Sequence, residues 1–330
     1  MITVSVIVTF YNQENYVDTA MQCIFGQKTD FDFDVIVGDD GSSDRTMEKV
    51  QSWIDRYPGR IRAFVRSRED GVTVPGFRAS RNRLSLLEQA DGKYFIFLDG
   101  DDYFTDANKL QKQVEILERE ENRDCVACSH YIEALYPDGH KVSLPVQQLS
   151  EGKYDLKRYW THLYFHTDTT LVRSSVIAKL PKDIVINNFN DNMITFLLLL
   201  QGSIYFIPEK MAVYLQTGDG IWTSRKAVVN HIRNLFLYDL CEILAPDAVR
   251  ESDIRLSPSW KYLYQHRDEI NKSELEPFVR EAEERALRWS QLFLNYQSLS
   301  GAEKNELRAK ANVVFRRSFA NRVKRKLSRG

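Results

Sequence analysis

The first third of the chain alternates between short apolar runs and segments in which apolar residues recur at helical spacing. Four of the runs are rich in β-branched and aromatic residues, and we predict that they form buried strands at residues 4–9, 33–37, 61–65 and 94–98. Helical spacing between the runs predicts helices over residues 16–27, from Ser43 or Asp44 onward, and over residues 80–90. This alternation indicates an α/β fold with right-handed crossovers and a mostly parallel sheet.

The pattern changes after Lys109. We expect strands in the run CVACSHYIEAL and at residues 169–172 and 204–207, and helices over residues 109–121 and 191–200. From about Ser224 onward the chain reads as mostly helical and is rich in Glu, Arg and Lys. These features predict a domain over residues 1–225 and a helical C-terminal region over residues 226–330.

The composition is that of an ordinary globular protein, with 43% hydrophobic and 28% charged residues in 330. The net charge of −1 gives the whole chain no electrostatic attraction to nucleic acid, so we predict no nucleic-acid partner. Four cysteines suggest no disulfide framework. The first residues lack the pattern of a signal peptide, and apolar runs such as FLLLL are too short to span a membrane. A cytoplasmic location is therefore expected.

An acidic turn follows the fourth predicted strand. Asp99, Asp101 and Asp102 come directly after FIFL, and three neighbouring carboxylates repel one another unless a cation neutralises them. Oxygen ligands at this density suit Mg²⁺ or Mn²⁺, with water and a diphosphate completing the coordination. The alternative is a solvated acidic turn.

Two more polar turns end predicted strands at the same edge of the sheet, where open α/β sheets bind ligands. Asp40, in the turn GDDGSSD, is suited to accept a hydrogen bond from a base N–H. The alternative is a strand-to-helix turn in which Ser43 or Asp44 caps the helix. Tyr11 is suited to stack on a planar base, and a core aromatic is the alternative.

Taken together, the three turns resemble those of the inverting family 2 glycosyltransferases of GT-A fold. The matching segments are VSVIVTFYNQENYVDTAMQCIFGQ, DVIVGDDGSSDRT and ASRNRLSLLEQADGKYFIFLDGDD, and the resemblance covers roughly residues 1–225. It implies a Rossmann-like, mostly parallel mixed sheet flanked by helices. Residues 1–110 would form the nucleotide-sugar half and residues 111–225 the acceptor half.

The resemblance also implies roles for individual residues on the donor side. Thr9 and Tyr11 would line the base and ribose pocket. Asp40 would hold a pyrimidine N–H, which favours a UDP-sugar donor and a dTDP-sugar next. Arg81 would lie near the diphosphate. Cofactor and donor are thus expected to be Mn²⁺ or Mg²⁺ and a nucleoside-diphosphate sugar.

In the metal motif, the resemblance implies that Asp99 meets the ribose or a metal-bound water. Asp101 would bind the metal directly, and Asp102 would support the metal site. The family's Tyr-Arg-x-His motif is replaced here by Tyr214-Leu215-Gln216-Thr217, which removes a His ligand. The loop at residues 218–220 would close over the donor.

Asp191 is the candidate catalytic base. The family carries a Glu-Asp pair at the start of a late helix, and this chain has Asn190-Asp191 in its place. An Asp at a helix start is stabilised as the anion and is ready to accept a proton. The alternative is a plain helix N-cap. Thr167, Asp168 and the next two residues line the acceptor side or form a satisfied polar loop.

The last residues are strongly basic. Residues 308–330 contain nine Lys or Arg and no acid, and apolar side chains recur there at Phe315, Phe319, Val323 and Leu327. Such a helix suits an anionic membrane surface, and a solvated terminal helix is the alternative. The C-terminal region is also a candidate for oligomer formation.

The predicted function is metal-dependent, inverting transfer of a sugar to a hydroxyl of a glycan or lipid-linked glycan, as in cell-envelope polysaccharide biosynthesis. A peripheral location at the inner face of the cell membrane would fit that acceptor. Two other classes stay open. A nucleotidyltransferase would carry a Gly-rich, basic phosphate loop, and residues 5–13 contain neither Gly nor Lys. A non-catalytic sugar-nucleotide or glycan-binding module would bind donor without transfer.

Overall fold

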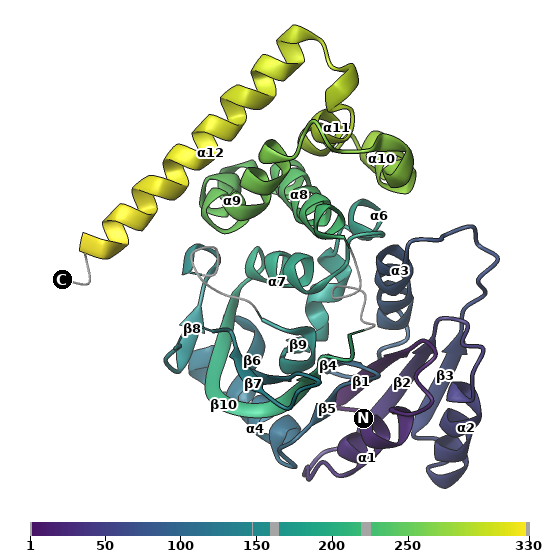
Figure 1. Ribbon diagram of the computed structural model, residues 1–330. Helices are drawn as coiled ribbons and strands as arrows, with labels where there is room; N and C mark the ends of the chain where they lie inside the picture. Colours follow the sequence, from purple (N-terminus) through teal and green to yellow (C-terminus); the bar gives the residue numbers. More distant parts are fainter. Residues whose placement is uncertain (1, 147, 159–164, 219–225, 328–330) are drawn as a thin grey trace. The chain divides into compact units, whose positions relative to one another are not determined.

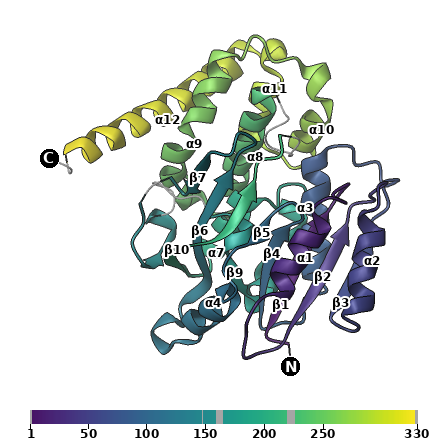
Figure 2. The same cartoon turned by 60° about the horizontal axis from the view of Figure 1, so that its bottom comes forward.

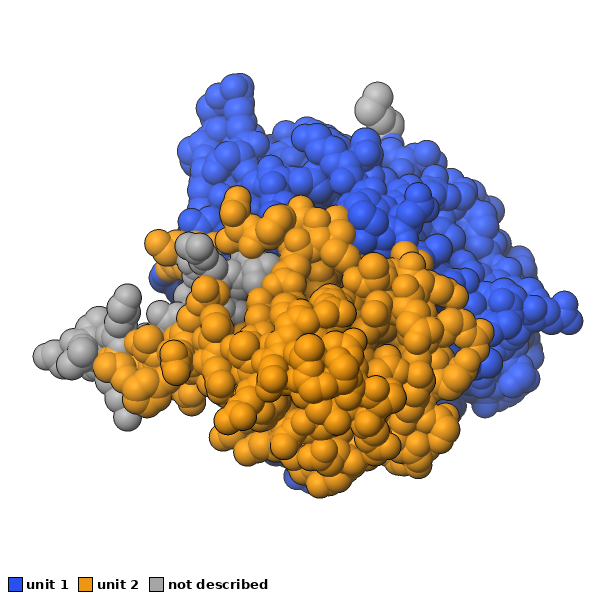
Figure 3. Space-filling model, turned by 90° about the horizontal axis from the view of Figure 1, so that it is seen from above, with its two compact units in different colours: residues 1–156, 163–220 blue, residues 157–162, 221–330 orange. Residues whose placement is uncertain are grey.

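The computed structural model describes residues 2–146, 148–158, 165–218 and 226–327 (Figure 1). Side chains at residues 248–255, 321 and 324–327 also lie outside the description. The chain divides into two compact units, coloured separately in Figure 3. Unit 1 comprises residues 1–156 and 163–220, and unit 2 comprises residues 157–162 and 221–330. The boundary predicted near Arg225 lies outside the described residues.

Unit 1 is built on one mixed sheet whose strands run in the order β3-β2-β1-β4-β9-β6-β10-β5, with β7 paired to β6 and β8 to β10. The strands are β1 (Val4–Phe10), β2 (Phe33–Asp39), β3 (Ile61–Val65), β4 (Tyr94–Asp99), β5 (Tyr103–Phe104), β6 (Cys125–Leu135), β7 (Lys141–Leu144), β8 (Gly152–Tyr154), β9 (Leu171–Arg173) and β10 (Ser203–Leu215). Strands β3, β2, β1 and β4 are parallel neighbours, as Figures 1 and 2 show. The predicted mostly parallel α/β fold is confirmed.

The parallel register brings the three polar turns to one edge. Thr9 of β1 pairs with Gly38 of β2 and with Asp99 of β4, so the three strands end level with one another. The runs that form them are almost entirely buried, which is why they lack the polar alternation of a half-exposed strand.

Helices cover both faces of the sheet. On one face, Val6, Val8 and Ile96 share an apolar cluster with α1 (Val17–Phe25), α2 (Thr46–Arg56) and α4 (Lys109–Glu118). On the other face lie α3 (Pro75–Leu87) and α7 (Asp191–Leu199), with the short α6 (Lys182–Val185) before α7. Since side chains alternate along a strand, Thr9 and Asp99 point to the α3 face.

Helix α3 packs very closely on β2. A Cβ added at Gly38 would lie 2.3 Å from Leu86 Cδ1 and 2.7 Å from Asn82 Oδ1. Asn82 Nδ2 also donates to the carbonyl of Gly38, at 3.0 Å. This contact fixes the height of the middle of α3 above the sheet.

Element boundaries differ from the sequence prediction in three places. Helix α3 begins at Pro75 rather than at residue 80, because a proline is well suited to the first helical position. Helix α2 begins at Thr46, and neither Ser43 nor Asp44 is its N-cap residue, although the Thr46 N–H donates to Asp44 Oδ1. Strand β10 extends to Leu215, well beyond the predicted residue 207.

At α7, the Asn190 side chain accepts from the Met193 N–H, so the N-cap residue is Asn190 and not Asp191.

Unit 2 is helical. Its main helices are α8 (Ala227–Leu244), α9 (Val249–Gln265), α10 (Glu276–Glu284), α11 (Arg288–Leu294) and α12 (Gly301–Leu327). The core centres on Trp260, which packs edge-on against Tyr238 and Phe293. Helix α12 runs alongside α9 (Figures 1 and 2). Of the described helices, none is both long enough and apolar enough to cross a bilayer.

Candidate active site

The first two polar turns are tied to each other by hydrogen bonds. Asn12, at φ +50°, accepts from the Ser43 N–H at 2.8 Å, and its own N–H donates to Ser42 Oγ at 2.8 Å. The Glu14 N–H donates to Asp44 Oδ2 at 3.0 Å. The turns after β1 and β2 therefore form one rigid edge.

The acidic turn after β4 depends on a glycine. A Cβ on Gly100 would lie 2.1 Å from Phe10 Cδ1, so no other residue fits between Asp99 and Asp101 without displacing the ring. The Asp102 N–H closes the turn on the carbonyl of Asp99 at 2.9 Å. The three carboxylates consequently leave the turn in three different environments.

Asp99 is neutralised by Arg83, a residue of α3 that the sequence analysis did not identify. Arg83 Nη2 lies 2.6 Å from Asp99 Oδ1 and 2.8 Å from Oδ2, and Thr9 Oγ1 donates to Asp99 Oδ1 at 3.2 Å. The same guanidinium reaches Asp191 Oδ1, 3.3 Å from Nη1. One buried arginine thus joins the end of β4 to the start of α7.

Burial opposes the charge of Arg83, but the carboxylates of Asp99 and Asp191 outweigh it and raise the pKa of the guanidinium. Asp191 Oδ1 also accepts from Thr167 Oγ1 at 3.2 Å, and His166 Nε2 lies 3.9 Å from Asp191 Oδ2. The candidate base therefore has a cationic neighbour in Arg83 and a defined orientation.

Asp101 is the acid of the motif that has no cation beside it. In the part of the chain that the structure describes, no Lys, Arg or His lies within ion-pair distance of its carboxylate. Burial and the charge of Asp99 raise the pKa of Asp101 to about 6. A partly exposed carboxylate without a counter-charge suits a divalent cation, and the metal-binding role of Asp101 stays a prediction.

Asp102 lies deeper, in a buried group with His166 and Asp168. Ligand atoms of these three residues lie within 4.8 Å of one another. Asp102 Oδ1 accepts from the Leu215 N–H at 2.8 Å, whereas Oδ2 of Asp102 and Oδ2 of Asp168 have no hydrogen-bond partner. Burial and Asp168 raise the pKa of Asp102 well above its usual range. Such open carboxylate oxygens fit a hard divalent cation or a shared proton.

His166 supplies positive charge to this group. Its Nδ1 lies 3.5 Å from Asp168 Oδ1. Burial lowers the basicity of the ring, but Asp168 and Asp191 outweigh this and raise the pKa of His166 to about 9. The sequence offered no metal-type spacing of His residues, because the group holds a single His and Asp102 comes from a distant segment.

On the donor side, Asp40 and Tyr11 are both in contact with arginines. Arg78 binds the Asp40 carboxylate through Nε at 2.9 Å and Nη2 at 2.8 Å, and Arg68 Nη1 lies 3.3 Å from Asp40 Oδ2. The Arg68 guanidinium stands 4.1 Å from the centre of the Tyr11 ring. A base stacked on Tyr11 would therefore take the place of Arg68.

Arg81 is directed elsewhere. Its Nε donates to Asn187 Oδ1 at 2.8 Å, in the segment that leads into α7. The structure thus gathers Thr9, Asp99 and Asp191 around Arg83, and Tyr11 and Asp40 around Arg68, with Arg81 in neither group. Of the loop predicted at residues 218–220, Gly218 has a φ of +85°, and the other two positions lie outside the described residues.

Sequence reasoning had one usable signal for Arg83. Gly76, Ser80, Arg83 and Leu87 recur at helical spacing and are all buried, so the arginine interrupts a stripe of small and apolar residues. His166 and Asp168 gave no such signal, since they lie in a single 3₁₀ turn, Thr167–Thr169, and its preceding residue.

Comparison with known proteins places this geometry in a family. The model for glycosyl transferase family 2 matches residues 5–180. An uncharacterized protein of Mycobacterium tuberculosis is 30% identical over 221 residues, which cover 67% of this chain and 60% of the relative. An uncharacterized glycosyltransferase of Rickettsia typhi is 28% identical over 210 residues, 62% of this chain and 61% of the relative. The chain spans about 60% of the length of these curated relatives.

Solved structures share the fold at low identity. TarS 1–349 of S. aureus in complex with UDP-GlcNAc aligns with a TM-score of 0.61 and 18% identity, over 97% of this chain and 92% of that one. The mannosyltransferase PcManGT from Pyrobaculum calidifontis, in complex with GDP-Man and Mn²⁺, aligns with a TM-score of 0.53 and 15% identity, over 89% and 86%. With a family model that matches more than half of its length and a fold shared with these enzymes, the chain belongs to glycosyl transferase family 2.

Proposed function

We propose that the protein transfers a sugar from a nucleoside-diphosphate sugar to an acceptor hydroxyl, with inversion at the anomeric carbon. The observation that carries this proposal is the position of Arg83, which holds Asp191 beside the acids at the end of β4. A base at one side of a cation-binding turn is the arrangement that a single displacement requires. Family membership supports the reaction class.

The donor proposed is a UDP-sugar, with a dTDP-sugar next. Tyr11, 44% exposed, offers a ring face for the base, and Asp40 offers a carboxylate for a pyrimidine N–H once Arg68 moves aside. Thr9 and Asp99 are proposed on the ribose side, and Arg81 near the diphosphate. The structures of TarS with UDP-GlcNAc and of PcManGT with GDP-Man support a nucleotide-sugar donor.

Asp101 is proposed to hold Mn²⁺ or Mg²⁺, with Asp102 supporting the site from below. When bound, the ion would neutralise charge on the departing diphosphate. The carboxylate of Asp101 and the open oxygens of Asp102 and Asp168 fit a hard cation. The Mn²⁺ in the PcManGT complex supports a metal in a protein of this fold.

Asp191 is proposed to remove the proton from the acceptor hydroxyl as the new bond forms. Arg83 and Thr167 fix Oδ1 and keep the carboxylate ionised, and the helix start adds to this effect. General base catalysis of this kind contributes about 10²–10⁴ in rate. Positioning of donor and acceptor contributes much of the remainder.

The acceptor proposed is a glycan or a lipid-linked glycan. Unit 1 would carry donor binding and catalysis, with residues 1–110 on the donor side and residues 111–225 on the acceptor side. We also propose a cytoplasmic location at the inner face of the membrane. Four free thiols support a reducing compartment, since no two of the cysteines are joined.

Calorimetry tests the proposal. The full chain is titrated with UDP, dTDP and GDP, each with and without Mn²⁺, and Asp101→Ala is compared with the wild type. We expect Mn²⁺-dependent UDP binding that Asp101→Ala weakens at least tenfold. Asp183→Ala, which removes an acid from the short helix α6, serves as the control. This variant should bind UDP as the wild type does.

Turnover separates the enzyme from a binding module. Asp191→Asn should retain UDP binding and lose about 10²–10⁴ in the rate of UDP release from a UDP-sugar, with or without acceptor. Asn190→Ser, which keeps a helix cap, is the matched control. Binding of UDP without any turnover by the wild type would indicate a binding module. An unchanged rate in Asp191→Asn would exclude this residue as the base.

A further inference from the structure

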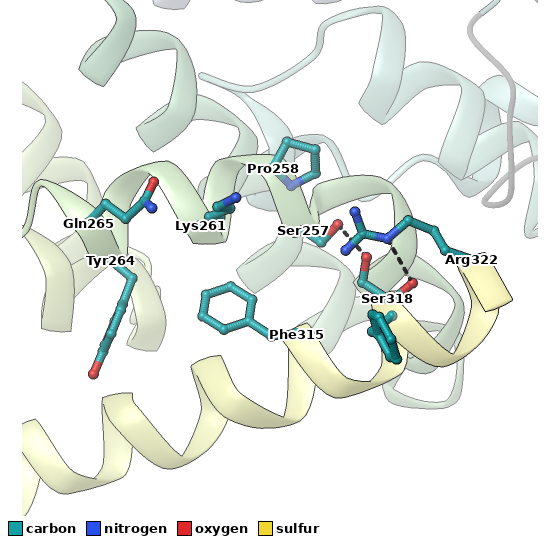
Figure 4. A pocket seen from close by; sticks show the side chains of 9 residues that line it. Ser257, Pro258, Lys261, Tyr264, Gln265, Phe315, Ser318 and Arg322 are labelled. Atoms are coloured by element: carbon teal, nitrogen blue, oxygen red, sulfur yellow. Dashed lines mark hydrogen bonds between the residues drawn. The ribbon is translucent and has the colours of Figure 1, made fainter.

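Unit 2 contains an open groove of about 700 Å³ between α9 and α12. Its apolar lining is provided by Pro258, Tyr264, Phe315 and Phe319, and its two cations are Lys261 and Arg322. Figure 4 shows the Phe315 ring between the two helices, with Arg322 at one end of the groove and Tyr264 at the other. Within this lining no residue carries a carboxylate.

The end of the groove near Arg322 is polar and well ordered by hydrogen bonds. Ser257 of α9 and Ser318 of α12 are joined through their hydroxyls at 2.9 Å, and Arg322 Nε donates to the carbonyl of Ser318 at 3.3 Å (Figure 4). The hydrogen bond from Nε orients the guanidinium at this end of the groove, and a guanidinium suits a phosphate.

The two cations of the groove lack the acidic partners that other cations of unit 2 have. Lys310 pairs with Glu242, Arg288 with Glu306 and Arg280 with Glu276. Lys261 and Arg322 form no ion pair with any described residue. Their charge is available to an external anion.

Apolar side chains next to these cations are exposed. Phe319 is 65% exposed and Val323 is 40% exposed, one helical turn apart on α12. An exposed aromatic and an exposed aliphatic residue beside cations are typical of helices that lie in a membrane interface. Residues 308–330, with nine Lys or Arg and no acid, add attraction to an anionic surface.

We propose that the groove between α9 and α12 binds an anionic phospholipid of a bilayer surface. The acyl chain would lie over Pro258, Phe315 and Phe319, and the phosphate would meet Arg322 and Lys261. This site is separate from the donor site and does not depend on the proposed reaction.

Two other occupants fit the observations less well. A second copy of the chain, docked through the same face, would bring the nine cations of residues 308–330 in one copy toward those of the other. A single-stranded nucleic acid could stack on the exposed Phe319, but the exposed aliphatic Val323 would add nothing to stacking, whereas both side chains would enter a bilayer interface. Charge and shape together favour a lipid.

Vesicle co-sedimentation of the full chain tests the proposal. Vesicles of phosphatidylcholine alone are compared with vesicles of equal parts phosphatidylcholine and phosphatidylglycerol. We expect binding to the mixed vesicles only, weakened by high salt. Arg322→Gln should lower the affinity about fivefold, Arg322→Lys should restore most of it, and Phe319→Ser should lower it further.

Matched controls on the same helix separate the groove from a general charge effect. Val313 is 41% exposed and Arg308 is exposed, and neither lines the groove. Val313→Ser should bind nearly as the wild type does, and Arg308→Gln should lower the affinity less than Arg322→Gln does. If they weaken binding as much as Phe319→Ser and Arg322→Gln, the groove is not the site.

Three further results would overturn the proposal. Equal binding to phosphatidylcholine vesicles would remove the anionic requirement. Full competition by glycerol 3-phosphate would indicate a site for a soluble phosphate. Competition by single-stranded RNA, with no sedimentation on vesicles, would assign the basic helix to nucleic acid. Circular dichroism of each variant checks that α12 is still folded.

Discussion

Buried carboxylates are treated differently in the two units. In unit 2, Asp239 of α8 is 2% exposed and accepts from the Trp289 N–H, the Ser290 N–H and the Ser290 hydroxyl at 2.8, 2.8 and 2.5 Å. Both of its oxygens have partners at the start of α11. In unit 1, Asp102 and Asp168 are equally buried, and one oxygen of each has no partner.

The comparison distinguishes Asp239, whose hydrogen bonds stabilise the fold, from Asp102 and Asp168, which we propose to be part of a functional site. A buried polar atom without a partner costs free energy, and proteins rarely retain one unless the site needs it. Asp239 is fully satisfied and joins two helices. Asp102 and Asp168 each keep one oxygen without a partner, and Asp102 follows Asp101, where we propose that a cation binds.

The largest effect is expected at Arg83, whose guanidinium is the counter-charge of the site. Arg83→Gln removes a buried cation and leaves the partly buried Asp99 and Asp191 without their counter-charge, and it should lower the free energy of unfolding by about 3–5 kcal/mol. Chemical denaturation of the full chain measures this loss. Arg81 lies on the same helix, and its Nε donates to Asn187 rather than to an acid. Arg81→Gln is therefore the control and should lower the free energy of unfolding by less than about 1 kcal/mol.

Arg83→Lys sharpens the same test. A lysine keeps the charge but cannot contact both carboxylates through a planar fork. We expect it to recover part of the stability of the wild type and little of the turnover. Full recovery of both would mean that charge alone, rather than the bridge between β4 and α7, is what the site requires.

The next effect concerns Asp239. Asp239→Ala removes the acceptor of three hydrogen bonds at the start of α11 and should destabilise the full chain by about 2–3 kcal/mol. Denaturation by urea is the measurement, with Asp268→Ala, an exposed acid of the same unit, as the control. A neutral result at Asp239 would remove the contrast between the two units.

A pH dependence follows from the same residue. Burial raises the pKa of Asp239 to about 7, even though its hydrogen-bond donors lower it. Because the folded pKa exceeds the unfolded value of about 3.9, the folded protein binds the extra proton between these values, and stability falls as pH rises through that window. The slope is at most about 1.4 kcal/mol per pH unit. Asp239→Asn should flatten it when unfolding is measured from pH 5 to pH 8.

The smallest expected effect on stability is a gain rather than a loss, and it concerns Asp102. Asp102→Asn can still accept from the Leu215 N–H, and its amide can donate to the open oxygen of Asp168. We expect stability to rise by about 1 kcal/mol while Mn²⁺-dependent binding of UDP weakens. A destabilised Asp102→Asn protein would show that the two acids already share a proton that the amide cannot replace.

Much of the fold was predictable because its signals are local. The runs that form β1, β2, β3 and β4 are β-branched and bounded by turn residues, so their positions were predicted within one or two residues. The order of β9, β6 and β10 was not predictable, since it depends on which strands pair far along the chain. The length of β10 was missed because its second half carries Pro208, Glu209 and Lys210.

The candidate site was predictable where a motif was contiguous. Asp99, Asp101 and Asp102 follow one strand, and the structure confirms that they form the turn after it. Arg83, Arg78 and His166 were missed because their partners lie on other elements. Whether each predicted residue performs its proposed role is a question for the variants above.

The tight packing at Gly38 has a consequence for how the site is assembled. Gly38 of β2 lies under α3, and because it has no Cβ the helix can pack close to the sheet at this point. Arg83 lies one residue beyond Asn82, which is anchored to that same glycine. The missing side chain at position 38 therefore sets the distance that the Arg83 guanidinium spans between Asp99 and Asp191, so a residue far from any substrate would influence the proposed active site.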